Sequence, residues 1–188
     1  MRNLKEDILR QLEKPMTCLM DYYPLRIKNV SLVDKLVRRL VYDFKDGKSF
    51  EVDVFARETA DNLIRMYGTE CSDIVFSCVP ASSAEKNEIR YKSFCEKVCE
   101  LTGAVNGYEH VRVVGERLAI HENRSKEKEI REVNIIEFDE SWFKGRKVVL
   151  FDDVITRGIS YATYAGRLES IGAEVLGGIF LARTHYKI

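Results

Sequence analysis

The chain of 188 residues lacks any apolar run long enough to cross a bilayer, and residues 1–7 contain no hydrophobic core of a signal peptide. We therefore expect a cytoplasmic protein with no membrane partner. A net charge is also lacking, because thirty basic side chains balance thirty acidic ones. This balance does not favour the strongly basic surface of a nucleic-acid-binding protein. Single-stranded DNA stays open as a partner that is not favoured, and a homodimer stays open as well.

The chain has few prolines and no closely spaced pair of cysteines of the Cys-x-x-Cys kind. The chain has three prolines, and its five cysteines are odd in number and never spaced as Cys-x-x-Cys. This usage argues against a disulfide framework and against a structural zinc site, and it favours a reducing compartment. We find no repeat or low-complexity segment, and the length suits one domain with a sizeable core.

Helical periodicity dominates the first third of the chain, and strands alternate with helices afterwards. Predicted helices cover residues 3–14, 31–44 and 52–67, whereas residues 16–29 are expected to be irregular or short extended structure. The later strands are expected at residues 74–79, 110–114, 133–136 and 175–182, with a further strand from residue 147. The later helices are expected after the loop 81–84, through residues 91–101 as far as Gly103, and at residues 160–171. This order predicts an α/β fold with a mainly parallel five-stranded sheet flanked by helices.

One stretch, residues 148–160, joins a buried strand to polar chemistry. Four apolar residues run into an acid pair, and a loop with hydroxyls and a glycine then opens a helical pattern. These polar positions are Asp152, Asp153, Thr156, Gly158 and Ser160. Ligands of open α/β sheets lie beyond the carboxyl ends of the strands, and a glycine loop before a helix favours a phosphate. The acids must face something polar and neutral beside that phosphate, or a divalent cation. A ribose 5-phosphate meets these demands.

This stretch resembles the phosphoribosyl pyrophosphate (PRPP) signature of type I phosphoribosyltransferases. The resemblance implies that Asp152 and Asp153 hold the ribose hydroxyls as the catalytic acids. It also implies a cradle for the 5′-phosphate, formed by Thr156, Arg157, Gly158, Ile159 and Ser160. Arg157 stands where a second threonine is common in that family. Its guanidinium could contact the phosphate or point into solvent.

Several weaker pieces resemble the ComF branch of the same family, which is associated with competence and DNA uptake. They are residues 40–45, Val79-Pro80, Arg131-x-x-Asn134 before Phe138, and residues 181–183. The chain departs from that branch in lacking the N-terminal zinc-binding cysteines. A second departure is that residues 81–86 replace the usual arginine-rich run after Val-Pro.

The resemblance places the pyrophosphate in the loop after the first core strand. By position this loop carries Ala81, Ser82 and Ser83, and Arg90 is the nearest permanent cation. An equal alternative for Arg90 is a solvated residue in the first turn of a helix. The charged segment 116–132 falls where the family has a lid. Its candidate lid cations are Arg117, His121, Arg124, Lys126 and Lys128.

The implied organisation is a single phosphoribosyltransferase-like domain, residues 1–188. Residues 1–72 would form a helical hood and flanking helices, and residues 73–188 the PRPP-binding core. Tyr22, Tyr23 and His185 could stack on an acceptor base, or could be packing residues.

The implied activity is transfer of ribose 5-phosphate from PRPP to a nucleobase or other nitrogen acceptor, with release of pyrophosphate. Mg²⁺ is the expected cofactor, held through PRPP and water with Asp152 or Asp153 nearby. The alternative is a noncatalytic ComF-like protein that binds PRPP or a nucleotide in regulation or DNA uptake.

Overall fold

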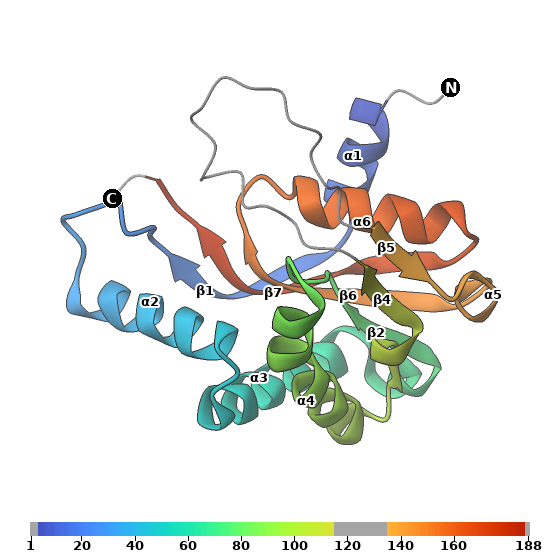
Figure 1. Cartoon of the computed structure of the whole chain (residues 1–188), viewed down its shortest axis with the longest axis horizontal. Helices are drawn as coiled ribbons and strands as arrows, with labels where there is room; N and C mark the ends of the chain where they lie inside the picture. Colours follow the sequence, from blue (N-terminus) through green and yellow to red (C-terminus); the bar gives the residue numbers. More distant parts are fainter. Residues whose placement is uncertain (1–3, 115–134, 187–188) are drawn as a thin grey trace.

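The computed structural model describes residues 4–114 and 135–186, and it has an α/β architecture (Figure 1). The α-helices are α1 (Leu4–Leu12), α2 (Leu32–Lys45), α3 (Ser49–Tyr67), α4 (Ala84–Thr102), α5 (Glu140–Phe143) and α6 (Ile159–Ser170). The strands are β1 (Met16–Tyr22), β2 (Ile74–Cys78), β3 (Val105–Asn106), β4 (Val111–Val114), β5 (Ile135–Phe138), β6 (Lys147–Ile155) and β7 (Glu174–Thr184). Two short 3₁₀ helices, η1 (Gly68–Asp73) and η2 (Tyr108–His110), precede β2 and β4.

A central sheet of five strands, all parallel, has the order β1-β7-β6-β2-β3. The prediction of a mainly parallel five-stranded sheet flanked by helices is confirmed at this level. Strand β6 lies in the middle and is paired on both sides. Its burial explains why it has an apolar run rather than an alternating pattern.

Two of the five strands in this sheet are not the ones that the sequence predicted. Residues 16–22, expected to be irregular or short extended structure, form the edge strand β1, which pairs along six positions with β7. Its methionines and cysteine give no strand periodicity, so only pairing with β7 reveals it. The predicted strands near residues 110–114 and 133–136 instead form β4 and β5, a separate antiparallel ribbon.

The two faces of the sheet are covered by different helices. Helices α2, α3 and α4 pack on one face around a core that includes Phe76 and Phe151, whereas α1, α5 and α6 pack on the other around Leu150 and Phe180 (Figure 1). Residues 1–72, expected to form a helical hood and flanking helices, thus include a strand of the central sheet and two helices of one covering layer. Among the described residues, no helix is both long and apolar enough to cross a membrane.

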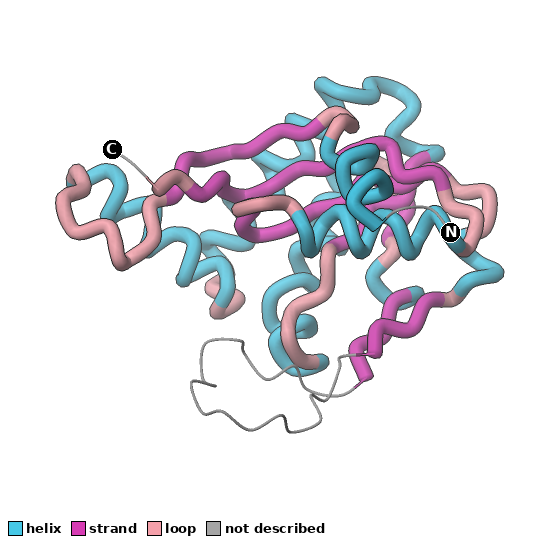
Figure 2. Tube along the Cα trace, turned by 90° about the horizontal axis from the view of Figure 1, so that it is seen from above, coloured by secondary structure: helices cyan, strands magenta, loops and turns pink. Residues whose placement is uncertain are grey.

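All five strands end at the same edge of the sheet because they are parallel. The loop that follows β1 lies on the same side as the end of β7 (Figure 2). The residues that follow β1, β2, β6 and β7 are therefore gathered at one edge, where a ligand of an open α/β sheet is expected.

Candidate functional site

The acid pair lies where β6 extends past its neighbour β2. The pairing of these two strands ends at Phe151 and Cys78, and the amide of Val79 then donates to the carbonyl of Phe151 at 2.8 Å. On the other side, β6 stays paired with β7 as far as Ile155. Asp152 and Asp153 therefore occupy the end of a central strand with one flank open towards the loop after β2.

Asp153 is held by two cations from two helices. Arg90 of α4 donates from Nη1 to Asp153 Oδ2, and Lys45 of α2 lies 3.4 Å from Oδ1. The Asp153 and Arg90 side chains are only 11% and 15% exposed. Of the two alternatives for Arg90, that of a solvated helix residue is wrong, because the side chain is largely buried and ion-paired.

An aromatic cluster fixes this arrangement. The rings of Phe44, Tyr91 and Phe151 lie with their centroids 6.0–6.4 Å apart, and all three side chains are fully buried. Phe44 and Tyr91 each adjoin one of the two cations in sequence, and Phe151 lies two residues before Asp153. Core packing of the three rings thus sets the position of the charged groups, since close-packed interiors tolerate little displacement.

Asp152 lies in a different electrostatic environment. Burial raises the pKa of its carboxyl well above the usual value, and the neighbouring charge of Asp153 raises it further. The amide of Asp153 donates to Asp152 Oδ1 at 2.8 Å, which partly offsets this effect. Within the described residues, Asp152 has no ion pair with a lysine or arginine. The two acids therefore have distinct roles: one is neutralised by protein cations, and the other favours protonation.

This asymmetry predicts that Asp152→Asn stabilises the protein at neutral pH. Because the pKa of Asp152 is higher in the folded state than in the unfolded chain, its contribution is most favourable below about pH 4 and declines as pH rises through the folded pKa. The neutral amide removes this decline. We expect the Tm of the variant at pH 7.5 to rise by about 2–4 °C, the shift for ~1 kcal/mol in a chain of this size.

Thermal unfolding between pH 4 and pH 8 tests this expectation. Glu100→Gln is the matched control, because it removes one exposed carboxylate from α4 and should leave stability within about 0.5 kcal/mol. A Tm of Asp152→Asn that stays below that of the wild type across this pH range would contradict the role given to burial.

The loop after β6 has the geometry of an anion cradle. Gly158 adopts φ +71°, in the left-handed region, and it begins α6 without a side-chain cap. Helices α2 and α4, by contrast, are capped by Ser31 and Ser83, whose hydroxyls accept hydrogen bonds from amides of the first helical turn. Uncapped first-turn amides are donors for an anion. The loop is tied to β7 by the hydroxyls of Thr156 and Thr184, which lie 2.9 Å apart.

The remaining predicted cradle residues are surface residues. Arg157, Ile159 and Ser160 are exposed, and Ile159 and Ser160 already belong to the first turn of α6. The structure thus brings all five predicted cradle positions together at the start of one helix.

Helix α1 packs against this loop through Leu12. A β-carbon on Gly158 would meet Leu12 Cδ2 at 2.4 Å, so the glycine allows a close contact between α1 and the loop. Glu169 of α6 anchors this end of the chain through Arg10, Gln11 and Lys14, with Arg10 Nη2 and Gln11 Nε2 at 2.8 and 2.7 Å. Burial alone would raise the pKa of Glu169, but the hydrogen bonds from Lys14 and Gln11 hold it below its usual value.

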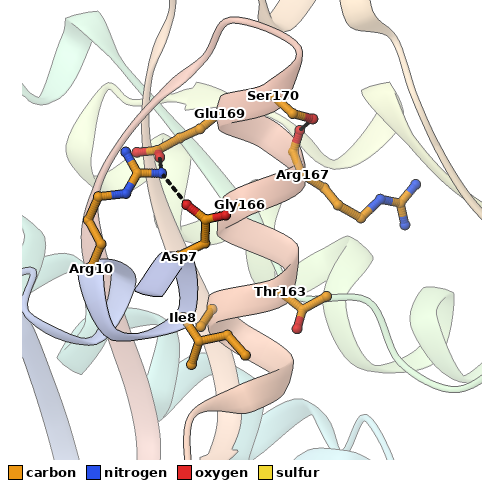
Figure 3. A pocket seen from close by; sticks show the side chains of 9 residues that line it. Asp7, Ile8, Arg10, Thr163, Gly166, Arg167, Glu169 and Ser170 are labelled. Atoms are coloured by element: carbon orange, nitrogen blue, oxygen red, sulfur yellow. Dashed lines mark hydrogen bonds and ion pairs between the residues drawn. The ribbon is translucent and has the colours of Figure 1, made fainter. Parts of the chain in front are cut away.

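A cavity of about 480 Å³ lies between α1 and α6, away from the acid pair (Figure 3). Arg10 of α1 pairs with Asp7 of the same helix and, across this cavity, with Glu169 of α6 (Figure 3). None of the residues that line the cavity is a predicted site residue. The ion pair between Arg10 and Glu169 holds α1 against α6, and hence Leu12 against the loop.

The loop after β2 is more closed than expected. Ala81 is buried, and its amide donates to Asn87 Oδ1 at 3.0 Å rather than pointing to a free anion. Ser83 caps α4 by accepting from the amide of Lys86. Ser82 lies between them and is half-buried. The three predicted pyrophosphate residues therefore flank the acid pair, but one of their backbone donors is already used.

The aromatic candidates for acceptor stacking differ from one another. Tyr22 packs against the core, and burial, followed by a hydrogen bond with Tyr42, raises its pKa to about 12. The rings of Tyr23 and His185 lie 5.6 Å apart, and His185 Nε2 is 2.7 Å from Asp21 Oδ1. Tyr22 is thus a packing residue in this structure, whereas the other two form a pair at the carboxyl edge. The predicted lid cations lie outside the described residues.

The small number of acidic side chains at the site determines which mode of Mg²⁺ binding it fits. Among the described residues, no group of three or more His, Cys, Asp or Glu side chains could hold a metal ion. Mg²⁺ usually binds through one or two carboxylates together with substrate phosphates and water. The site fits that mode, with Asp152 as the acid that has no cation partner in the described chain. The protein alone provides no cage for the ion there.

Two residues of the site were not identified from the sequence. Lys45 lies in a segment singled out by resemblance, but the sequence gave no reason to assign it a role. Asn87 gave no signal, because a buried amide is recognised only by its hydrogen-bond partner. A comparison with models of protein families finds none that matches this chain, and a comparison with curated proteins finds no significant match.

Proposed function

We propose that the protein is a PRPP-dependent phosphoribosyltransferase that transfers ribose 5-phosphate to a nucleobase or other nitrogen acceptor and releases pyrophosphate. The observation that carries this proposal is the juxtaposition of the acid pair with the uncapped, glycine-started helix α6 at the end of the central strand. A sugar phosphate with vicinal hydroxyls matches both parts. The finer fold assignment, type I phosphoribosyltransferase-like with an N-terminal hood, belongs to the same proposal.

Each residue has a role in this proposal. Asp152 and Asp153 accept hydrogen bonds from the ribose hydroxyls, and the first turn of α6 binds the 5′-phosphate. The reaction breaks the bond from the anomeric carbon to pyrophosphate and forms a bond to the acceptor nitrogen, while the nitrogen loses its proton to solvent or to a released phosphate oxygen. Positive charge grows on the ribose, so the ionised carboxylate of Asp153 stabilises the transition state electrostatically. Mg²⁺ would neutralise the departing pyrophosphate.

Arg90 supports the proposal from the leaving-group side. Its Nε is buried and has no hydrogen-bond partner in the described part of the chain, although its Nη1 donates to Asp153. A buried donor without a partner is costly, and a phosphate oxygen would satisfy it. We infer that Arg90 serves both the ribose side, through Asp153, and the pyrophosphate beside the loop after β2.

A second function is favoured by one specific observation, the use of the Ala81 amide by Asn87. A loop whose Ala81 amide is already hydrogen-bonded within the protein has one donor fewer for pyrophosphate. Such a loop suits a protein that binds PRPP or a nucleotide without transferring the sugar. This noncatalytic reading shares the acid pair and the cradle, and it differs only in turnover.

Pyrophosphate release separates the two functions. We expect the full chain with PRPP and Mg²⁺ to release pyrophosphate when one member of a panel of nitrogen acceptors is added. The same assay with Asp153→Asn is the control, and it should be slower by about tenfold to a hundredfold because one charged hydrogen bond is worth ~2–3 kcal/mol. PRPP binding without turnover on any acceptor would overturn the transferase and support the noncatalytic protein.

A further inference from the structure

The first two turns of helix α2 carry apolar side chains that the rest of the described chain leaves uncovered. Leu32, Val33 and Leu36 are 81%, 68% and 54% exposed, whereas Val41 and Phe44 nearer the end of the helix are 1% and 0% exposed. Figure 1 shows the reason, because α3 and α4 lie near the carboxyl end of α2 and the start of the helix extends beyond them. Exposed apolar side chains that gather on one face mark an interaction surface.

The three exposed side chains form one apolar ridge on the helix, made of Leu32, Val33 and Leu36. Leu36 follows Leu32 by four residues and Val33 by three, and residues at these spacings are neighbours on a helix surface. The helix start is fixed by a capping box, in which the amide of Ser31 donates to Asp34 Oδ2 at 2.9 Å and the amide of Asp34 donates to Ser31 Oγ at 3.1 Å. The ridge is therefore formed before a partner arrives, which lowers the entropic cost of binding.

Basic side chains border the apolar ridge. Lys35 and Arg39 each follow a leucine of the ridge by three residues, so they lie beside it along the helix. Both are exposed, and so is Lys28 in the loop before α2. The one acid between Lys28 and Arg39 is Asp34, and its carboxylate is already engaged by the capping box. The ridge thus has a positively charged border.

A second copy of the chain fits this face poorly. Three side chains cannot supply the area of about 800 Å² per partner that a standard interface needs, and a two-fold axis through the ridge would bring the basic borders of both copies together. The ridge is convex, so its partner must be a negatively charged surface that adapts to protruding side chains. The boundary between the headgroups and acyl chains of an anionic bilayer has both properties.

We propose that the start of α2 docks on an anionic lipid bilayer. The apolar ridge enters the boundary between headgroups and acyl chains, and Lys28, Lys35 and Arg39 face the headgroups. The expectation of no membrane partner followed from the lack of a spanning segment, and a helix that lies in the plane of the interface needs none. This inference is independent of the proposed transferase function, because no residue of the candidate site takes part in it.

Flotation of the full chain with lipid vesicles tests the proposal. Vesicles of ~70% phosphatidylcholine and ~30% phosphatidylglycerol are compared with vesicles of phosphatidylcholine alone, and we expect a partition coefficient at least about tenfold higher on the anionic ones. The difference should largely disappear in ~1 M NaCl, because salt screens the charges. Replacing both leucines, as in Leu32→Gln with Leu36→Gln, should lower the coefficient by about tenfold or more. Lys35→Gln should lower it about fivefold, the effect of one basic side chain near an anionic surface.

Two variants near the carboxyl end of α3 are matched controls. Ile64→Gln removes an apolar side chain that is 45% exposed, and Arg65→Gln removes an exposed basic one. Both should bind vesicles as the wild type does, and unchanged thermal unfolding of every variant would show that lost binding is not lost folding.

Three results would overturn the proposal. The first is an absence of vesicle binding, or equal partition onto neutral and anionic vesicles. The second is anionic binding that survives the loss of both leucines. The third is a dimer in sedimentation that depends on Leu32 and Leu36 in a protein that does not bind vesicles, which would assign the ridge to a second copy of the chain.

Discussion

Asp153→Asn is expected to weaken PRPP binding by about tenfold to a hundredfold, the effect of losing a charged hydrogen bond of ~2–3 kcal/mol. The same substitution is expected to lower the free energy of unfolding by about 2–4 kcal/mol, because Arg90 then keeps a largely buried charge without its carboxylate. Solvent reaches both side chains to a small extent, so the loss should fall short of that for a fully buried pair. Urea unfolding and PRPP calorimetry measure the two effects.

Two control variants separate stability from binding at this residue. Asp153→Asn combined with Arg90→Met removes both charges and should recover most of the stability without recovering PRPP affinity, since an apolar pair often replaces a buried ion pair at little cost. Asp53→Asn breaks the exposed ion pair with Lys97 between α3 and α4, and should cost less than about 1 kcal/mol. Wild-type PRPP affinity in Asp153→Asn would contradict the assignment of Asp153 as a contact to the ribose of PRPP.

Gly158→Ala is expected to damage the phosphate loop. A left-handed conformation costs a residue with a β-carbon about 1–2 kcal/mol, and the added carbon would also meet Leu12 Cδ2 at 2.4 Å. The Leu12 side chain or the loop must shift, and a shift of the loop would displace the first-turn amides of α6. We expect at least a tenfold loss of PRPP affinity, or about 1.4 kcal/mol, together with lower stability.

Other glycines of the chain supply matched controls for this substitution. Gly145→Ala has the same left-handed strain, at φ +76°, but open space around the new carbon and no part in the loop. Gly166→Ala lies inside α6 with ordinary φ and open space, and should stabilise the helix by about 0.5–1 kcal/mol. Leu12→Ala in the background of Gly158→Ala should restore part of the affinity if the clash is responsible. A Gly158→Ala protein that binds PRPP as Gly145→Ala does would contradict the cradle.

Much of the fold followed from local pattern. The apolar run before Asp152 predicted β6, and helical periodicity over residues 31–44 predicted α2. In the structure Ser31 and Asp34 form both hydrogen bonds of a capping box at the start of α2. Such features depend on residues within one or two turns of the chain. The strand β1 could not be predicted in the same way, because its stability comes from pairing with β7, more than 150 residues away.

The sequence predicted several individual residues of the candidate site, but it did not predict the ion pairs and hydrogen bonds between them. Asp152, Asp153 and Gly158 were identified because strand, acids, loop and helix start coincide in one stretch. The ion pairs of Asp153 with Lys45 and Arg90 join residues far apart in sequence, and single cations on helices carry no sign of their partners. The same limit applies to Asn87. Its side-chain oxygen accepts the hydrogen bond of the Ala81 amide, so that this amide of the predicted pyrophosphate loop is not free for a ligand.

The most direct measurement is a calorimetric titration of the full chain with PRPP in the presence of Mg²⁺, repeated with ribose 5-phosphate as a competitor. We predict saturable binding at one site per chain, competition by ribose 5-phosphate, and a loss of about tenfold or more in Asp153→Asn. Absence of PRPP binding, or binding that neither ribose 5-phosphate nor the substitution affects, would contradict a ribose-phosphate site at the end of β6.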